Sequence, residues 1–115
     1  MERTYFDNFD LAGACYYDLP LVFNKLKVGT LLTLRTEPEN RYDEYAIAIY
    51  FKKHKIGFVP ATENQQLSKL LQAGVNVFEA RVQTIKPDAH PAHQIRVVLY
   101  IVKAGERFYE ENLYK

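Results

Sequence analysis

The feature that most limits the fold of this chain is a series of short apolar or alternating segments, each followed by turn-forming residues. Strict alternation, or a short wholly apolar run, is typical of β-strands. Two of the segments, 45–51 and 56–59, flank three lysines and a histidine at 52–55, so we expect a hairpin with a basic tip. The predicted strands cover residues 9–14, 30–36, 45–51, 56–59, 76–85 and 94–103.

Two helices are expected between these strands. A short helix is predicted over 18–26, because Pro20 suits the first turn of a helix. A second helix follows Pro60, since Thr62 and Gln65 have the spacing of a capping box and Gly74 suits the C-terminal end. Its apolar stripe has i, i+3, i+4 spacing and consists of Leu67, Leu70 and Leu71.

These elements predict a mainly β fold with one or two short helices, arranged as a small OB-like or SH3-like β-barrel. With 115 residues, the chain has the size of one domain and can bury about two-thirds of the surface that its unfolded form exposes. No linker or repeat divides the sequence. We expect one barrel domain over residues 6–103 and a polar C-terminal tail over 104–115.

The charge of the chain is nearly balanced, with 15 basic and 14 acidic residues and a net charge of +1. Binding to nucleic acid or to an anionic membrane would therefore depend on local charge. A single cysteine excludes an internal disulfide framework and a cysteine-only zinc site. No apolar run approaches the roughly 18 residues of a spanning helix, and the N-terminus has no secretory pattern. We expect no membrane partner and an intracellular location, cytoplasmic if the chain is prokaryotic.

A search for catalytic and metal-binding patterns finds none that is complete. Neither a P-loop nor a GxGxxG pattern occurs. His90 and His93 lack the further ligands that a metal site needs, and Cys15 is expected to be buried and inert. The acidic residues at 37–44 alone favour a metal-dependent nuclease, but the metal-ligand set that it would need is missing. We predict no enzyme activity, no catalytic residue, no metal ligand and no cofactor.

The aromatic and basic residues are the more informative candidates. Flat rings either fill a barrel or stack on bases, and lysines at a hairpin tip either follow a phosphate backbone or are simply solvated. The aromatic residues expected in the core are Tyr45, Phe51 and Phe78. Those expected at the surface are Tyr16, Tyr17 and Tyr42. The dense basic cluster consists of Lys52, Lys53 and Lys55.

Three segments together resemble the HIRAN domain family: Gly-Ala-Cys-Tyr-Tyr at 13–17, Arg-Thr-Glu-Pro-Glu-Asn-Arg-Tyr-Asp-Glu-Tyr-Ala-Ile at 35–47, and Ile-Gly-Phe-Val-Pro at 56–60. The resemblance covers residues 9–85. It implies a modified OB-like barrel, found as stand-alone prokaryotic proteins and at the N-terminus of Swi/Snf-type fork-remodelling ATPases. In the eukaryotic members this domain binds the 3′ end of single-stranded DNA.

The resemblance also implies roles for individual residues. Tyr16 matches an aromatic residue that stacks on a terminal base, whereas Tyr42 and Asp43 match the loop that holds the terminal nucleotide and its 3′-hydroxyl. A carboxylate at Asp43 accepts a hydrogen bond from a 3′-hydroxyl but repels a 3′-phosphate. The predicted nucleic-acid-binding residues are Tyr16, Tyr17, Asn40, Tyr42, Asp43 and Phe58. The candidate phosphate contacts are Arg41, Lys52, Lys53 and Lys55.

Two hypotheses for function stay open at this stage. The first is a non-catalytic module that binds single-stranded DNA or a DNA 3′ end in DNA repair or processing, beside a separate helicase or nuclease. The second is a protein-interaction or scaffold domain in which Asn40 and Asp43 only cap a turn and Tyr42 packs the loop against the barrel. The second is favoured by departures from the DNA-binding members, which remove cations or add negative charge, at Cys15, Glu39, Phe58 and Ala61.

Overall fold

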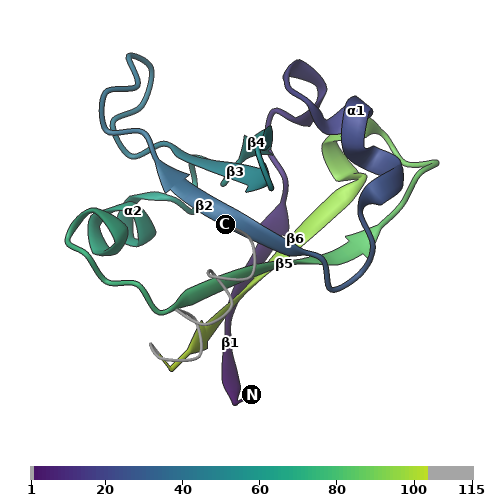
Figure 1. Cartoon of the computed structure of the whole chain (residues 1–115). Helices are drawn as coiled ribbons and strands as arrows, with labels where there is room; N and C mark the ends of the chain where they lie inside the picture. Colours follow the sequence, from purple (N-terminus) through teal and green to yellow (C-terminus); the bar gives the residue numbers. More distant parts are fainter. Residues whose placement is uncertain (1, 104–115) are drawn as a thin grey trace.

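Six antiparallel strands form one sheet in the computed structural model, which describes residues 2–103 of the chain (Figure 1). The predicted tail, residues 104–115, lies outside the described residues. The strands are β1 (Arg3–Asp10), β2 (Leu31–Thr36), β3 (Ile47–Phe51), β4 (His54–Phe58), β5 (Phe78–Ile85) and β6 (Ile95–Val102). The helices are α1 (Leu19–Val22) and α2 (Gln65–Gln72), with single 3₁₀ turns at Ala14–Tyr16, Phe23–Lys25 and Pro91–His93.

The order of the strands is β1-β6-β5-β2-β3-β4. The two outer strands approach each other, because Ala12, just after β1, forms an isolated bridge with Phe58 of β4 through two backbone hydrogen bonds of 2.9 Å. This bridge curls the sheet towards a closed barrel. The prediction of a mainly β, OB-like domain with two short helices is confirmed.

The core is built from the inward-facing side chains of these strands. Ile47 and Ile49 of β3, Ile56 of β4 and Val97 of β6 have no exposed surface. Residues at i and i+2 of a strand share a face, so alternate β3 residues line the core and the others line the opposite face. On that opposite face Ala48 is also fully buried, so Tyr50 is the β3 residue there that is partly open to solvent.

Two expectations for the aromatic core are confirmed and one is wrong. Phe51 and Phe78 are buried as predicted. Tyr45 lies in the loop before β3 and is only half-buried, with the Lys69 ammonium 5.8 Å from the centroid of its ring. Because Tyr45 lies in a loop, part of its ring stays open to solvent. The apolar sequence at 45–51 did not show that the strand begins only after Tyr45.

The N-terminal strand differs from its prediction. β1 begins at Arg3 rather than at residue 9, and it ends at Asp10. Residues 3–6 are exposed, and their sequence, Arg-Thr-Tyr-Phe, does not alternate between polar and apolar side chains. Backbone pairing with β6, from Arg3 opposite Val102 to Asp10 opposite Arg96, holds them in the sheet.

The second helix begins and packs differently from its prediction. The predicted capping box is wrong, because the residue before the helix is Asn64, whose side chain makes no cap hydrogen bond. The apolar stripe is also partly wrong, since Leu67 is buried but Leu70 is 40% exposed. The C-terminal end is as predicted: Gly74 has φ 91°, and Val75 N–H donates to the carbonyl of Leu70 at 3.0 Å.

Candidate nucleic-acid interface

The loop between β2 and β3 is organised by Asn40. Its Oδ1 accepts hydrogen bonds from the backbone N–H groups of Tyr42 (2.9 Å) and Asp43 (3.2 Å). Its Nδ2 donates to Glu37 Oε1 at 3.0 Å. Asn40 therefore caps the turn, as the structural alternative predicted. That alternative is wrong about Tyr42, because this residue is 90% exposed and does not pack the loop against the barrel.

Asp43 joins this loop to the start of α2. Its Oδ1 accepts from the backbone N–H of Tyr45 at 2.8 Å, and its Oδ2 accepts from Asn64 Nδ2 at 2.7 Å. Asn64 is buried, and sequence reasoning did not identify it. A carboxylate offers about four lone-pair positions, so these two bonds leave Asp43 able to accept another hydrogen bond. Asp43 is half-buried, which keeps it open to a ligand from the solvent side.

A second group of contacts surrounds the ammonium of Lys55 in β4. Lys55 Nζ lies 4.4 Å from the ring centroid of Phe58 and 4.9 Å from that of Tyr17. The two rings meet edge to face with centroids 5.4 Å apart. The same ammonium donates to Glu37 Oε2 at 2.7 Å. Lys55 was predicted to contact phosphate, but in the structure its charge is compensated by a carboxylate.

Glu37 links the two groups, because one oxygen accepts from Asn40 and the other from Lys55. Partial burial alone would raise the pKa of Glu37, but the hydrogen bonds from Lys55 and Asn40 outweigh it and hold the pKa below its ordinary value. Glu37 is thus a charged bridge at neutral pH. The sequence analysis grouped it with the other acidic residues at 37–44, and its place three residues before Asn40, in the segment that resembles the family, was the signal that could have distinguished it.

Tyr16 lies in the 3₁₀ turn between β1 and α1, and it is 82% exposed. The turn is held to β4 by the bridge between Ala12 and Phe58, and by Asp18 N–H, which donates to the carbonyl of Lys55 at 2.9 Å. Figure 1 shows this segment and the β2–β3 loop on the same side of the barrel, with β3 and β4 between them. Tyr16 and Tyr42 are therefore exposed rings at the two ends of one connected surface.

The prediction that Cys15 is buried is wrong, because its side chain is exposed. Gly13 has φ 68° and directs the chain into the turn so that Ala14 takes the buried position. Phe58, which was predicted to bind nucleic acid, is half-buried.

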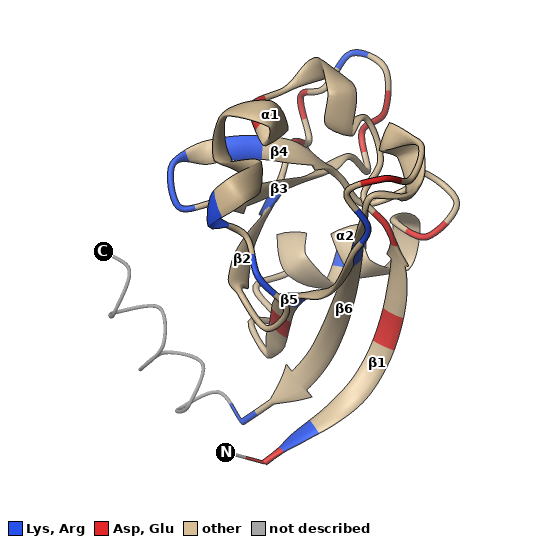
Figure 2. Ribbon diagram, turned by 90° about the vertical axis from the view of Figure 1, so that its right-hand side faces the viewer, with Lys and Arg blue, Asp and Glu red and all other residues tan. Residues whose placement is uncertain are grey.

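The remaining predicted cations lie at the edges of this surface. Arg41, Lys52 and Lys53 are exposed, and none forms an ion pair with another residue in the part of the chain that the structure describes. Lys52 and Lys53 form the turn between β3 and β4, whereas His54 and Lys55 belong to β4, so the basic tip is shorter than predicted. Figure 2 shows Lys and Arg at β4 and at this turn.

A separate ionic cluster lies at the end of β1. Asp10 Oδ2 contacts His93 Nδ1 at 2.9 Å, and Asp10 Oδ1 accepts from Arg96 at 3.1 Å. The hydrogen bond from His93 is the largest influence on the pKa of Asp10; partial burial opposes it, and Arg96 reinforces it, so the pKa is lowered. His93 is thus engaged with a carboxylate.

We expect this cluster to make folding stability depend on acid pH. A carboxyl with a lowered pKa in the folded state stabilises the fold above its unfolded pKa of 3.8, and this contribution is lost as pH falls through the folded value. The free energy of unfolding should fall between about pH 5 and pH 3, and it should fall less in Asp10→Asn. Urea unfolding at the two pH values measures both. An equal loss in the variant and the wild type would contradict the assignment.

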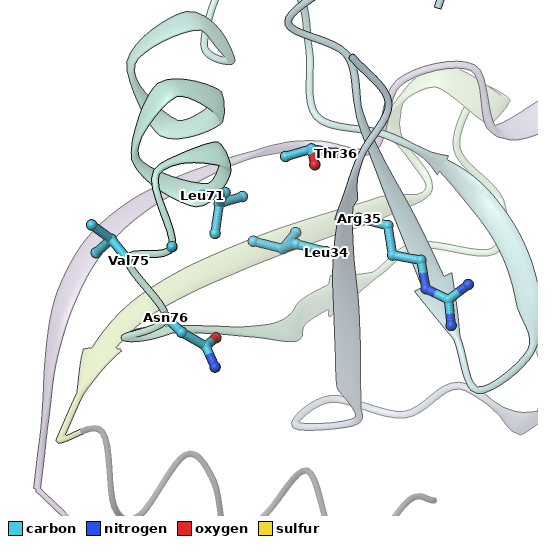
Figure 3. Close-up of a pocket in the computed structure, with 7 residues that line it drawn as sticks. Leu34, Arg35, Thr36, Leu71, Val75 and Asn76 are labelled. Carbon is cyan, nitrogen blue, oxygen red and sulfur yellow. The ribbon is translucent and has the colours of Figure 1, made fainter. Parts of the chain in front are cut away.

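A pocket of about 560 Å³ lies between β2 and the C-terminal end of α2 (Figure 3). It is lined by Leu34, Arg35, Thr36, Leu71, Gly74, Val75 and Asn76. No predicted site residue is among them, so this pocket is distinct from the surface that joins Tyr16 to Tyr42.

Two other kinds of site are absent from residues 2–103. No cluster of three or more His, Cys, Asp and Glu side chains there has an arrangement that could hold a metal ion. Over the same range, none of the helices combines the length and the apolar character needed to cross a membrane.

Comparisons with known proteins identify relatives of the chain. The family model of the HIRAN domain matches residues 6–102. A crystal structure of a protein from Lactobacillus plantarum superposes with a TM-score of 0.74 at 22% identity, covering 87% of this chain and 95% of that one. The HIRAN domain of human HLTF superposes with a TM-score of 0.63 at 15% identity, covering 96% and 88% respectively. At these identities the likeness shows the fold. No curated protein sequence matches.

Proposed function

Because this chain belongs to the HIRAN domain family, whose members are DNA-binding modules, we propose that it binds single-stranded DNA at a 3′ end and carries no catalysis of its own. The observation that carries the proposal is the pair of exposed rings, Tyr16 and Tyr42, at the two ends of a surface held rigid by hydrogen bonds. Exposed rings on a fixed frame are suited to stacking on bases.

Asp43 gives this surface its preference for a free 3′-hydroxyl. The carboxylate is oriented by Tyr45 N–H and Asn64, and it retains acceptor capacity for a hydroxyl donor. A terminal phosphate in the same place would bring two negative charges together. Since hydrogen bonds to charged groups contribute about 1.5–3 kcal/mol, the preference should be about 10-fold or more.

The charges around this surface set the expected strength of binding. Lys55 is compensated by Glu37, and the exposed residues Cys15, Glu39 and Ala61 supply no cation. Stacking then supplies more of the affinity than phosphate contacts do, and binding should depend only moderately on salt. We place this activity inside the cell, cytoplasmic if the chain is prokaryotic, beside a separate helicase or nuclease that processes DNA.

The test is a fluorescence-anisotropy titration with short oligothymidines that end in a 3′-hydroxyl or a 3′-phosphate. The wild type should prefer the hydroxyl by about 10-fold or more, and Asp43→Asn should lose the preference. Asp88→Asn is the matched control, because Asp88 is an exposed carboxylate in the β5–β6 loop. Equal affinity of the wild type for both ends, or no binding at low salt by folded protein, would contradict the proposal.

Binding of a protein partner is the second candidate function, and one observation favours it. β2 pairs with β5 only at Leu31 and Leu32, and the pocket beside the rest of β2 is lined in part by Leu34, Leu71 and Val75. An extended segment can add to an open strand edge and place its side chains in such a pocket. Leu71→Asp should abolish this binding and leave binding to oligothymidine unchanged.

A further inference from the structure

The outer face of β2, β3 and β4 has features that the predicted site does not use. Register places Thr33, Tyr50 and Lys55 in one row across the three strands, and Arg35, Ala48 and Phe58 in the next. Because Ile47 and Ile49 point into the core, Ala48 and Tyr50 lie on the opposite face, where Ala48 is fully buried and Tyr50 is half-buried. This face connects the β2–β3 loop, at one end of β3, with the turn of Lys52 and Lys53 at the other end.

Arg35 is an exposed and uncompensated cation on this face. Its guanidinium carbon lies 4.5 Å from the centroid of the Tyr50 ring. Among residues 2–103 it has no carboxylate partner, in contrast to Lys55 on the neighbouring row, which is paired with Glu37. In Figure 3 the Arg35 side chain points away from Leu34 and Leu71, so its charged end does not lie in the pocket that its backbone helps to line.

We propose that Arg35, held over Tyr50, binds a backbone phosphate of a single strand whose 3′ nucleotide lies at Asp43. The strand then continues in the 5′ direction along the outer face of β3, towards Lys52 and Lys53. This inference rests on the proposed function, and it adds the direction of the strand and its main charge contact.

The chemistry of the pair suits a phosphate. A guanidinium presents a planar set of donors that can engage two phosphate oxygens at once, and it can do so while one face rests on an aromatic ring. The ring restricts the side chain, so less conformational freedom is lost on binding. A lysine paired with glutamate, as Lys55 is, would have to break that pair first.

The size of the face limits the length of DNA that it can hold. β3 has five residues, which span roughly 15 Å at about 3.3 Å each. This fits the lower end of the site sizes known for OB folds, about 4 nucleotides. Affinity should therefore rise with oligothymidine length up to about 4 nucleotides and then level off.

The test compares oligothymidine binding at about 50 and 200 mM salt for the wild type, Arg35→Gln and Arg35→Lys. The salt slope is the decrease of the logarithm of the binding constant with the logarithm of salt concentration, and each lost phosphate contact lowers it by about 0.7. The loss of affinity between the two salt concentrations should therefore be about 2.5-fold smaller in Arg35→Gln than in the wild type. Arg35→Lys should restore most of the slope. Lys86→Gln is the matched control, because it removes one exposed positive charge from the β5–β6 loop and should leave the slope unchanged.

The preference for a 3′-hydroxyl separates the two proposals. Arg35→Gln should retain it, since Asp43 is intact. A wild-type slope in Arg35→Gln, with the preference still present, would overturn the phosphate role of Arg35 and leave the proposed function standing. An equal loss of slope in Lys86→Gln would also overturn it, because the effect would be one of net charge. Absence of binding by the wild type would overturn both proposals.

Discussion

Replacing Gly57 with alanine is expected to lower the free energy of unfolding by about 3 kcal/mol, at the upper end of the usual cost of overpacking. A Cβ at this position would lie 2.6 Å from the carbonyl oxygen of Ala12 and 2.7 Å from two side-chain carbons of Leu11. The carbonyl belongs to the bridge between Ala12 and Phe58, so it cannot rotate away without breaking the contact that brings β1 to β4.

Thermal unfolding followed by circular dichroism measures this effect, and the midpoint should fall by on the order of 10 °C. Gly29→Ala is the control: Gly29 has φ 91° and no neighbouring atom within 4 Å, so it should cost only about 1–2 kcal/mol of left-handed strain. Equal losses in the two variants would show that the close approach at Gly57 is not what makes glycine necessary there.

The same variant should also weaken DNA binding. The bridge that Gly57 permits holds the 3₁₀ turn of Tyr16 against β4, together with the hydrogen bond from Asp18 N–H to the carbonyl of Lys55. An alanine would push this segment outwards and separate Tyr16 from the surface that contains Phe58. Stability and binding are therefore linked through a residue that does not itself contact the ligand.

Replacing Tyr16 with alanine is expected to weaken oligothymidine binding by about 1–3 kcal/mol, which is about 5- to 150-fold, and to leave stability unchanged. The ring is 82% exposed, so its removal leaves no cavity. A titration by fluorescence anisotropy gives the affinity, and thermal unfolding of the same sample shows whether the fold is intact.

Two further variants identify the source of this effect. Tyr16→Phe keeps the stacking face and should bind almost as well as the wild type. Tyr5→Ala removes another exposed tyrosine, from β1, and should have little effect on binding. Unchanged affinity in Tyr16→Ala would place the base-stacking surface elsewhere and would favour Tyr42, at the other end of the same surface.

The strands of the β2–β4 region were predictable because their signals are local. The alternation over 30–36, and the two apolar runs around the lysines at 52–55, led to β2, β3 and β4 with small shifts at their ends. β1 was placed too late, because its first residues are held by pairing with β6 and carry no apolar pattern of their own. Pairing with a distant strand leaves no mark on the sequence nearby.

The residues of the candidate site likewise fall into those that a local sequence pattern identifies and those that depend on distant partners. Tyr16, Tyr42 and Asp43 were predicted as site residues because they belong to a recognisable pattern. Glu37 was grouped only with the acidic residues at 37–44, and Asn64 was overlooked, since each acquires its role from a residue far along the chain: Lys55 for Glu37, and Asp43 for Asn64. For the same reason Lys55 was expected to meet phosphate, although its partner Glu37 neutralises it.

By itself, therefore, the sequence determined the β-rich class of the fold, its helices and most of its strands, the HIRAN family, and the residue types that could meet DNA. Periodicity and short motifs report only on neighbours along the chain. The tertiary structure decided which cations are compensated, which rings are exposed, and that Arg35 lies over Tyr50 on the face beside Lys55. These properties depend on contacts between strands, because burial and charge compensation arise only when distant segments are packed together.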